Sequence, residues 1–594
     1  MRRFILCLSL CLLPVALAAQ QAADAVEPEA AGAGQVAVSE QTLHALEAKA
    51  AGRPVEAKDW MVAAANPLAV EVGARVLEQG GTAADAMVAV QAVLGLVEPQ
   101  SSGLGGGAFL VWYDGESGEL TTLDGRETAP LAATPRLFQD EAGEPLDFYD
   151  AVVGGRSVGV PGTPALLKAA HEAWGRSEWT GLFDEAIRLA DEGFAVSPRL
   201  STMVAGDAVR LTRFAPTRAY FFPEGKLPEV GQVLKNPDYA ETLRTLASEG
   251  PAPFYTGDIA QDIVATVQGA PGNPGVMEEI DLAIYSVKER APVCVPYRGY
   301  EVCGMGPPSS GALTVGQILG LLAPFDLAGM GAESAEAWRL IGDASRLAFA
   351  DRGRYMADTD YVPVPVEGLV EPGYLAERAE LLKGEAALEA VEPGAPEYDH
   401  ALNWADDASI EFPSTSHISI VDGYGNALSM TTTIENGFGS RLMVRGFLLN
   451  NELTDFSFTS HEDGRPVANR VEPGKRPRSS MAPTIVLKDG KPVLVVGSPG
   501  GSRIIGYVAK TIIAHLDWGM DVQEAVALPH LVNRFGTYDV EGGLVSDELV
   551  GALAGMGFEV NRNVLTSGLH AISVQEGGLL GGADPRREGV AVGR

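Results

Sequence analysis

Cysteine and histidine are scarce in this chain, with 4 cysteines and 8 histidines among 594 residues. No two of them have the Cys-x-x-Cys or His-x-x-x-His spacing that zinc sites use. The sequence therefore predicts no metal site. Removal of an N-terminal signal would leave only Cys294 and Cys303.

Basic residues are also few. Lys and Arg total 44 residues against 78 Asp and Glu, so the formal net charge is −34 at pH 7. Such an excess of negative charge opposes binding to nucleic acid and to anionic lipid. With 46% hydrophobic and 21% charged residues, the chain is still typical of a globular protein with a large core.

The N-terminus lacks an apolar run long enough for a membrane anchor. The run over residues 4–17 follows Arg2 and Arg3, and it is shorter than the about 20 residues that a spanning helix needs. Small residues follow it, so we expect a signal peptide at residues 1–19 and a periplasmic or secreted protein. Residues 20–55 are rich in Ala, Glu and Gln, and we expect a mobile segment there.

Cys294 and Cys303 flank a turn candidate at residues 297–299, between two short runs of strand-forming residues. A hairpin there would place the two thiols on facing strands, and an oxidising compartment permits a disulfide. Two unpaired buried thiols are the alternative. The sequence leaves both open.

Two glycine motifs match known sites, but their surroundings contradict the match. The glycines at 103–107 fit a loose dinucleotide fingerprint, yet they follow a predicted helix and lead into a predicted strand at 109–113, the reverse of the required order. The pattern Gly-x-Ser-x-Gly at 155–159 fits a nucleophile elbow, but Pro161 breaks the chain where a helix must begin. We therefore predict neither NAD binding nor a serine nucleophile at Ser157.

A β-hairpin pattern begins at Thr415. Residues alternate between two faces as far as Asp422, a Gly/Asn turn follows, and a second strand is predicted over residues 427–434. The preceding segment, residues 384–414, contains no Lys or Arg. We expect that segment to bury little surface and to move freely.

A series of motifs in fixed order adds to this pattern. They are Thr415-Ser-His-Ile-Ser-Ile-Val-Asp422, Gly437-Phe-Gly439, Leu449-Asn-Asn451, Asp455-Phe456, Gly474-Lys-Arg-Pro477, Ser479-Ser-Met481 and Gly497-Ser-Pro-Gly-Gly-Ser-Arg503. In this order they resemble gamma-glutamyltransferases, a family of N-terminal-nucleophile hydrolases. The resemblance implies an α+β fold, a four-layer αββα sandwich with two antiparallel sheets face to face and helices outside.

The resemblance also implies that the chain cuts itself between Ser414 and Thr415. Residues 56–414 would form a large subunit and residues 415–594 a small one, both contributing to one core. A threonine hydroxyl is a poor nucleophile at neutral pH and needs a base, whereas a free α-amino group has a pKa of about 7.7–8.0. Cleavage would therefore give Thr415 a base on its own main chain.

The remaining catalytic residues are assigned by the same resemblance. Thr433 would orient Thr415, and the backbone N–H groups of Gly500 and Gly501 would bind the oxyanion. His417 is expected to be an ordinary strand residue.

A γ-glutamyl group carries an ammonium and a carboxylate, so its pocket needs groups of both signs. Arg126 resembles the arginine that binds the α-carboxylate, and the other residues of this set are its helpers Ser479 and Ser480 and the ammonium acceptors Glu452 and Asp455. Glu435 stands where many family members have Asn. A carboxylate there could also accept a hydrogen bond from the ammonium.

The expected activity is cleavage of the γ-glutamyl amide of glutathione and related compounds through a threonyl ester. Water, an amino acid or a peptide would accept the group, and no cofactor is needed. The departure at Glu435 keeps a related enzyme open, namely a β-lactam or glutaryl acylase or one acting on polyglutamate. An exported, unprocessed scaffold protein is a further alternative.

Overall fold

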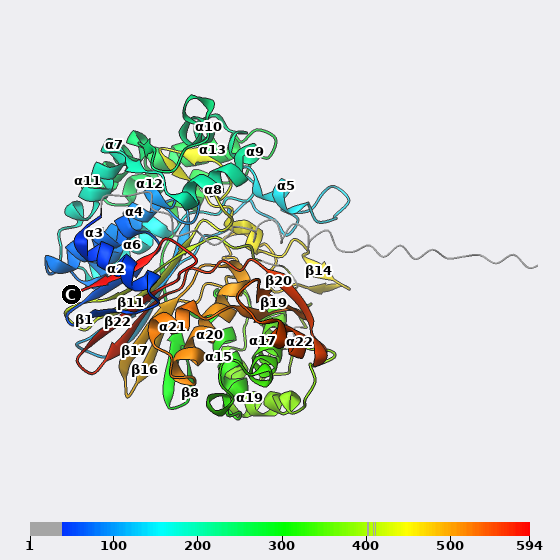
Figure 1. The fold of residues 1–594 in the computed structure, drawn as a ribbon. Helices are drawn as coiled ribbons and strands as arrows, with labels where there is room; N and C mark the ends of the chain where they lie inside the picture. The colour runs from blue at the N-terminus through cyan, green and yellow to red at the C-terminus, as the bar shows by residue number, and fades with distance from the viewer. Residues whose placement is uncertain (1–37, 401–402, 408, 410) are drawn as a thin grey trace, which may run out of the picture.

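Two seven-stranded antiparallel sheets form the centre of the protein (Figure 1). The computed structural model describes residues 38–400, 403–407, 409 and 411–594, so the predicted signal peptide lies outside the described residues. In sheet order, the first sheet is β23 (Val590–Gly593), β2 (Met61–Ala64), β10 (Ser416–Val421), β11 (Ala427–Thr433), β3 (Gly107–Tyr113), β4 (Leu120–Gly125) and β7 (Lys288–Arg290). The second is β1 (Val55–Ala57), β22 (Gly578–Ala583), β21 (His570–Gln575), β17 (Lys491–Gly497), β16 (Thr484–Lys488), β9 (Tyr300–Gly304) and β8 (Val293–Tyr297).

Alternation along the strands creates the layers. On β10, Val421 joins an apolar cluster shared with the second sheet, whereas Ile418 and Ile420 face the helices on the other side. Those helices include α3 (Pro67–Glu78), α4 (Ala83–Val97) and α6 (Thr163–Trp174). The outer face of the second sheet packs against α15 (Gly311–Leu322), α17 (Ala335–Tyr355), α20 (Ile504–Leu516) and α21 (Val522–Ala527). Figure 1 shows this αββα order, which confirms the predicted fold class.

Smaller elements complete each layer. Beside the first sheet are α5 (Phe148–Val152), α7 (Asp184–Glu192), α8 (Pro198–Gly206), α9 (Ala208–Leu211), α10 (Ala215–Phe221), α11 (Pro237–Glu249), α12 (Ala252–Thr256), α13 (Asp258–Gln268) and α14 (Glu279–Ala283). Elsewhere lie α16 (Leu327–Met330), α18 (Val366–Val370), α19 (Pro372–Ala379), α22 (Asp547–Gly555) and a small sheet of β18 (Leu531–Asn533), β19 (Thr537–Glu541) and β20 (Glu559–Asn563). Two-stranded pairs are β5 (Phe194–Ala195) with β6 (Val233–Leu234), β12 (Met443–Val444) with β13 (Phe447–Leu448), and β14 (His461–Glu462) with β15 (Arg465–Pro466). Within the described ranges, no helix combines the length and apolar character needed to span a membrane.

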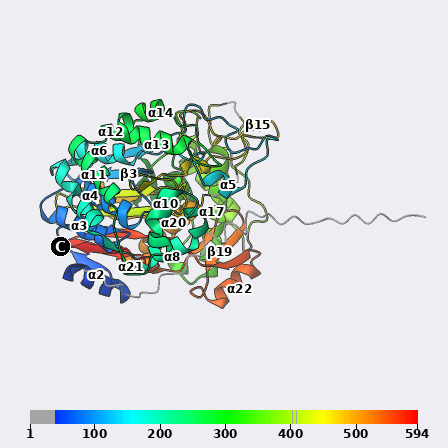
Figure 2. The same ribbon diagram turned by 90° about the horizontal axis from the view of Figure 1, so that it is seen from above.

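The N-terminal segment differs from expectation at residues 40–50, which form helix α2 (Glu40–Ala50). Ser39 caps this helix, and the buried residues Thr42 and Ala45 provide its packing face. Lys49 donates a hydrogen bond to the carbonyl of Gly589 at 2.7 Å. Figure 2 shows α2 beside the C-terminal end of the chain. Partners more than 500 residues away stabilise this helix, so local composition could not predict it.

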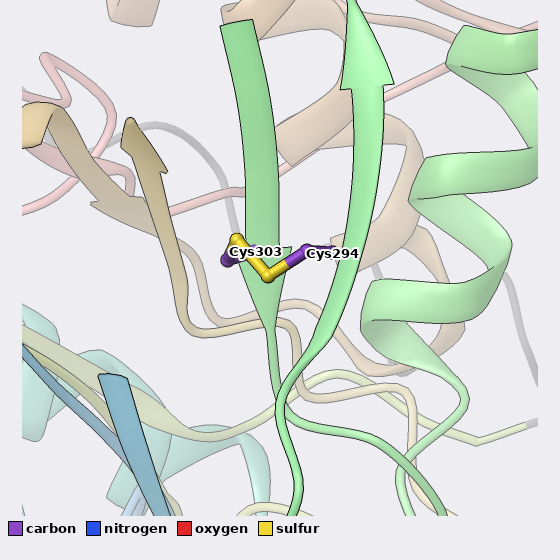
Figure 3. The surroundings of a disulfide bond; sticks show 2 residues. All are labelled: Cys294 and Cys303. Atoms are coloured by element: carbon purple, nitrogen blue, oxygen red, sulfur yellow. A yellow bond between two sulfur atoms is a disulfide. The ribbon is translucent and has the colours of Figure 1, made fainter. Parts of the chain in front are cut away.

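Cys294 on β8 and Cys303 on β9 form a disulfide bond (Figure 3). The two residues are direct partners in the strand register, with their Cα atoms 4.1 Å apart. Of the two alternatives left open by the sequence, the structure has the bonded pair.

Candidate active site

The hydroxyl groups of Thr415 and Thr433 meet at one end of the β10–β11 hairpin. Thr415 directly precedes β10 and Thr433 ends β11, and the register pairs Ser416 with Thr432. The hydroxyl of Thr415 donates to the hydroxyl of Thr433 at 3.0 Å. The same Thr433 oxygen accepts the backbone N–H of Glu435 at 2.8 Å. The hairpin therefore holds the candidate nucleophile in one orientation.

The backbone at Thr415 is strained. Its φ is +88°, in the left-handed region that a β-branched residue rarely adopts. Such a conformation costs about 1–3 kcal/mol and persists only where the surroundings impose it. Here the surroundings include Arg587, whose guanidinium donates to the carbonyl of Thr415 at 3.2 Å.

His417 lies between the two sheets and does not serve Thr415. Its Nδ1 is 2.9 Å from the hydroxyl of Thr431, and its Nε2 is 3.0 Å from that of Ser419. Burial, with His570 nearby, holds the pKa of His417 well below its ordinary value. His417 is a neutral core residue, in keeping with its predicted place on the strand.

Most of the predicted site residues line one buried pocket around Thr415. Its lining residues are Arg126, Glu411, Phe412, Thr415, Thr433, Glu435, Glu452, Asp455, Ser479, Ser480, Met481, Gly501 and Ile504. Gly500 is absent from this lining. The space left inside is about 20 Å³, room for a water molecule but not for an amino-acid side chain.

Arg126 forms the cationic centre of the pocket. It follows β4 and is fully buried, and its guanidinium pairs with the carboxylates of Glu452 and Asp455. It also donates to the backbone carbonyls of Pro477 and Arg478, at 3.2 and 2.8 Å. Burial alone would lower the pKa of Arg126, but the neighbouring carboxylates raise it above its ordinary value.

Carboxyl groups outnumber this arginine. Burial raises the pKa values of Glu435, Glu452 and Asp455 well above the ordinary range, although Arg126 opposes the rise for Glu452 and Asp455. Sequence reasoning missed Glu411, which also lines the pocket, and Glu127, which lies outside the lining and whose pKa is raised by burial to about 8. The position of Glu127 next to Arg126 in the sequence was the one available signal. The pocket is therefore suited to a cationic group.

The hydroxyl groups of the two serines bond to groups of the protein in the uncut chain. The hydroxyl of Ser479 accepts the N–H of Met481 at 3.1 Å, and that of Ser480 accepts from Arg352 at 2.8 Å. Glu452 and Asp455 already bind the guanidinium of Arg126. Both serines line the pocket, but within the described part of the chain neither bonds to that arginine.

Two glycines permit close backbone contacts at the site. A Cβ on Gly106 would lie 1.9 Å from the carbonyl oxygen of Thr433, so the glycine-rich loop supports the hairpin. Gly501 has a φ of +57°, and a Cβ there would lie 2.4 Å from the carbonyl oxygen of Glu411. Gly501 begins a 3₁₀ turn (Gly501–Arg503) that leads into α20, and this helix N-terminus favours negative charge.

Ser157 of the rejected elbow donates to the carbonyl of Val152 at 2.6 Å and is structural.

The end of the segment before Thr415 is more buried than its composition predicts, whereas most of residues 384–400 are exposed or half-buried as expected. Glu411 and Ser414 are 6% and 2% exposed. Glu411 pairs with Arg352, which lies on α17. The sequence offered no signal for this pair, because 59 positions separate its members.

Comparisons with known proteins agree with this geometry. The sequence model of the family described as gamma-glutamyltranspeptidase matches residues 69–594. The chain is 39% identical over 549 residues to the glutathione hydrolase proenzyme of Bacillus subtilis (strain 168), covering 90% of this chain and 92% of that protein. It is 33% identical over 541 residues to the acylase ACY 1 proenzyme of Pseudomonas sp. (strain SE83), covering 89% and 92%. The crystal structure of cephalosporin acylase from Bacillus halodurans matches with a TM-score of 0.80 at 26% identity, over 91% of this chain and 97% of that one. Because the family model matches residues 69–594 and the fold has the same four layers, the chain belongs to the gamma-glutamyltranspeptidase family.

Proposed function

We propose that the protein is a self-processing enzyme that cleaves γ-glutamyl amides through an ester on Thr415. The observation that carries this proposal is the hydrogen bond from Thr415 to Thr433 at the wall of a buried pocket that also holds Arg126 and several carboxyl groups. Relatives named glutathione hydrolase proenzyme point to glutathione as a donor.

Maturation is a transfer of one acyl group. The hydroxyl oxygen of Thr415 attacks the carbonyl carbon of Ser414, the C–N bond breaks, and the hydroxyl proton goes to the nitrogen. Water then hydrolyses the ester, which leaves a carboxylate on Ser414 and a free amino group on Thr415. The piece that ends at Ser414, with residues 56–414 as its main part, becomes the large subunit, and residues 415–594 become the small one.

Turnover reuses the same oxygen. The new α-amino group takes the proton from the Thr415 hydroxyl as that oxygen attacks the γ-amide, then passes it to the departing amine. The γ-glutamyl ester is next cleaved by water, or by an amino acid or peptide. Gly500 and Gly501 would donate N–H groups to the oxyanion.

The charges of the pocket support a donor with an ammonium. Glu435, Glu452 and Asp455 would accept its hydrogen bonds, while Arg126, with Ser479 and Ser480, would bind the α-carboxylate. That requires Arg126 to exchange a carboxylate partner for the donor. It also requires the segment at Glu411 and Phe412 to leave, since the remaining space is too small for a glutamyl group.

An acylase for glutaryl or β-lactam amides is the second candidate, favoured by the acylase relatives and by a carboxylate at Glu435. A glutaryl group lacks the ammonium, so the surplus carboxyl groups would have no cation to bind and would stay protonated in their buried site. Comparing kcat/KM for γ-glutamyl and glutaryl anilides separates the two candidates. We expect at least a tenfold preference for the γ-glutamyl compound.

N-terminal sequencing of the smaller fragment of purified protein tests the proposal as a whole. We expect the sequence Thr-Ser-His. A different start would refute the assignment of Thr415, and a chain that stays intact would support the unprocessed scaffold instead. We also infer export, because disulfides persist in oxidising compartments, and cell fractionation checks this.

A further inference from the structure

A carboxylate of the uncut chain itself occupies part of the pocket. Glu411 lies four residues before Thr415, and its side chain pairs with the buried guanidinium of Arg352. The Nε of Arg478 lies 3.7 Å from the same carboxylate oxygen. Ser480 adds a hydrogen bond to this carboxylate. The side chains of Arg352, Arg478 and Ser480 thus form a binding site for this carboxylate.

The main chain around Glu411 is fixed as well. Its carbonyl accepts the N–H of Ser502 at 3.2 Å, next to Gly501. The ring of Phe412 packs on Phe148 with their centroids 4.3 Å apart. Ser414 donates its hydroxyl to the carbonyl of Gln100 at 2.9 Å. The segment is therefore held on both sides of Pro413.

The ion pair is the strongest of these attachments. Burial alone would raise the pKa of Glu411, but Arg352 and Arg478 hold it below its ordinary value, so the carboxylate is charged at neutral pH. Removing one partner of a buried pair leaves an uncompensated buried charge, which is strongly unfavourable. Asp407, farther from the cut, also pairs with Arg478 at 3.0 Å. Glu411 is the one charged residue of residues 411–414, so the register next to the cut depends on its contact.

We propose that Glu411 is a positioning residue for self-cleavage, whose carboxylate binds Arg352 and Arg478 and thereby holds the carbonyl of Ser414 within reach of the Thr415 hydroxyl. The proposal rests on the proposed cleavage before Thr415. It assigns Arg352 and Arg478 a role in the uncut chain that is separate from donor binding at Arg126.

The test measures the rate of self-cleavage of freshly purified, uncut protein by gel densitometry. Glu411→Gln keeps the shape of the side chain and removes its charge, and we expect cleavage to slow at least tenfold. Glu411→Asp keeps the carboxylate and should recover much of the rate. Glu397→Gln is the matched control, because Glu397 is an exposed residue of the same segment, and it should cleave at the wild-type rate.

A second measurement separates positioning from folding. Glu411→Ala removes a group of about the size of acetate, so added acetate, but not chloride at equal ionic strength, should speed its cleavage. A wild-type rate in Glu411→Gln overturns the proposal. So does the combined result that Glu411→Asp cleaves as slowly as Glu411→Gln and that acetate does not speed the cleavage of Glu411→Ala. Failure of the underlying cleavage proposal is a different result, namely a wild-type fragment that does not begin at Thr415.

Discussion

Thr433 accepts the hydroxyl hydrogen of Thr415 at 3.0 Å, across two strands that pair from Ser416 to Val421. Replacing Thr433 with valine keeps its shape but removes this acceptor. Valine also leaves the N–H of Glu435 without this acceptor. A loss of about 1–3 kcal/mol predicts a fall of roughly fivefold to 150-fold in both self-cleavage and kcat. Thr433→Ser is the control and should stay within about tenfold of wild type. Equal rates in the valine and serine variants would contradict a role for this hydroxyl.

Thr415→Ala should yield an uncut, inactive chain, because it lacks the oxygen that both reactions need. Thr415→Ser should retain some of each activity, since it keeps a hydroxyl group on Cβ at the same position of the backbone. Gel analysis and an anilide assay give both readouts. Normal cleavage in the alanine variant would refute the mechanism.

The strain at Thr415 makes a separate prediction about stability. Both Thr415→Gly and Thr415→Ala stay uncut, but only glycine adopts a φ of +88° without steric cost. The glycine variant should therefore be more stable by about 1 kcal/mol despite its more flexible unfolded chain. Urea unfolding of the two proteins measures the difference. An alanine variant of equal or greater stability would show that the left-handed backbone is not strained.

Arg126→Lys tests recognition of the α-carboxylate. Lysine keeps the charge that Glu452 and Asp455 need, but it loses the planar fork that can bind a donor carboxylate through two parallel bonds. We expect the KM for γ-glutamyl donors to rise at least tenfold, while self-cleavage stays within about threefold of wild type. Loss of cleavage together with donor binding would assign Arg126 a structural role.

Glu127 links stability to pH. Its pKa in the folded chain is about 8, above the ordinary glutamate value, so the folded state keeps a proton that the unfolded state has released. Stability contributed by this group is present in acid and is lost as pH rises from about 4.5 to about 8. In the uncut Thr415→Ala background, Glu127→Gln should reduce the fall in Tm between pH 5 and pH 8. If Tm falls equally between pH 5 and pH 8 in both proteins, a group other than Glu127 causes the pH dependence.

Local signals predicted the elements around the site well. Asn66 caps α3, and Thr82 with Asp85 forms the capping box of α4, as residues of these types do at helix starts. The β10–β11 hairpin follows from alternation and a glycine turn. Strand β13 covers only Phe447–Leu448, because Asn450 and Asn451 donate their backbone N–H groups to the carbonyls of Gly105 and Ile434 instead.

Contacts between distant residues were the part that the sequence could not supply. The order of motifs brought Arg126, Glu452 and Asp455 into one hypothesis, but not their mutual pairing in the uncut chain. The pair of Glu411 and Arg352 depends on how α17 packs against the end of the segment before Thr415. Such pairs follow from the assembled sheets, and no local pattern records them.

The order of strands in the first sheet has a consequence for the cut protein. Strand β2 lies between β23 and β10, so a piece ending at Ser414 has one of its strands inserted between two strands of the other piece. In the second sheet, β1 and β9 flank a block of four strands from the C-terminal piece. Pulling the pieces apart would break backbone ladders in both sheets at once. The two chains should therefore remain associated on dilution and melt in a single transition, like one polypeptide with a missing peptide bond.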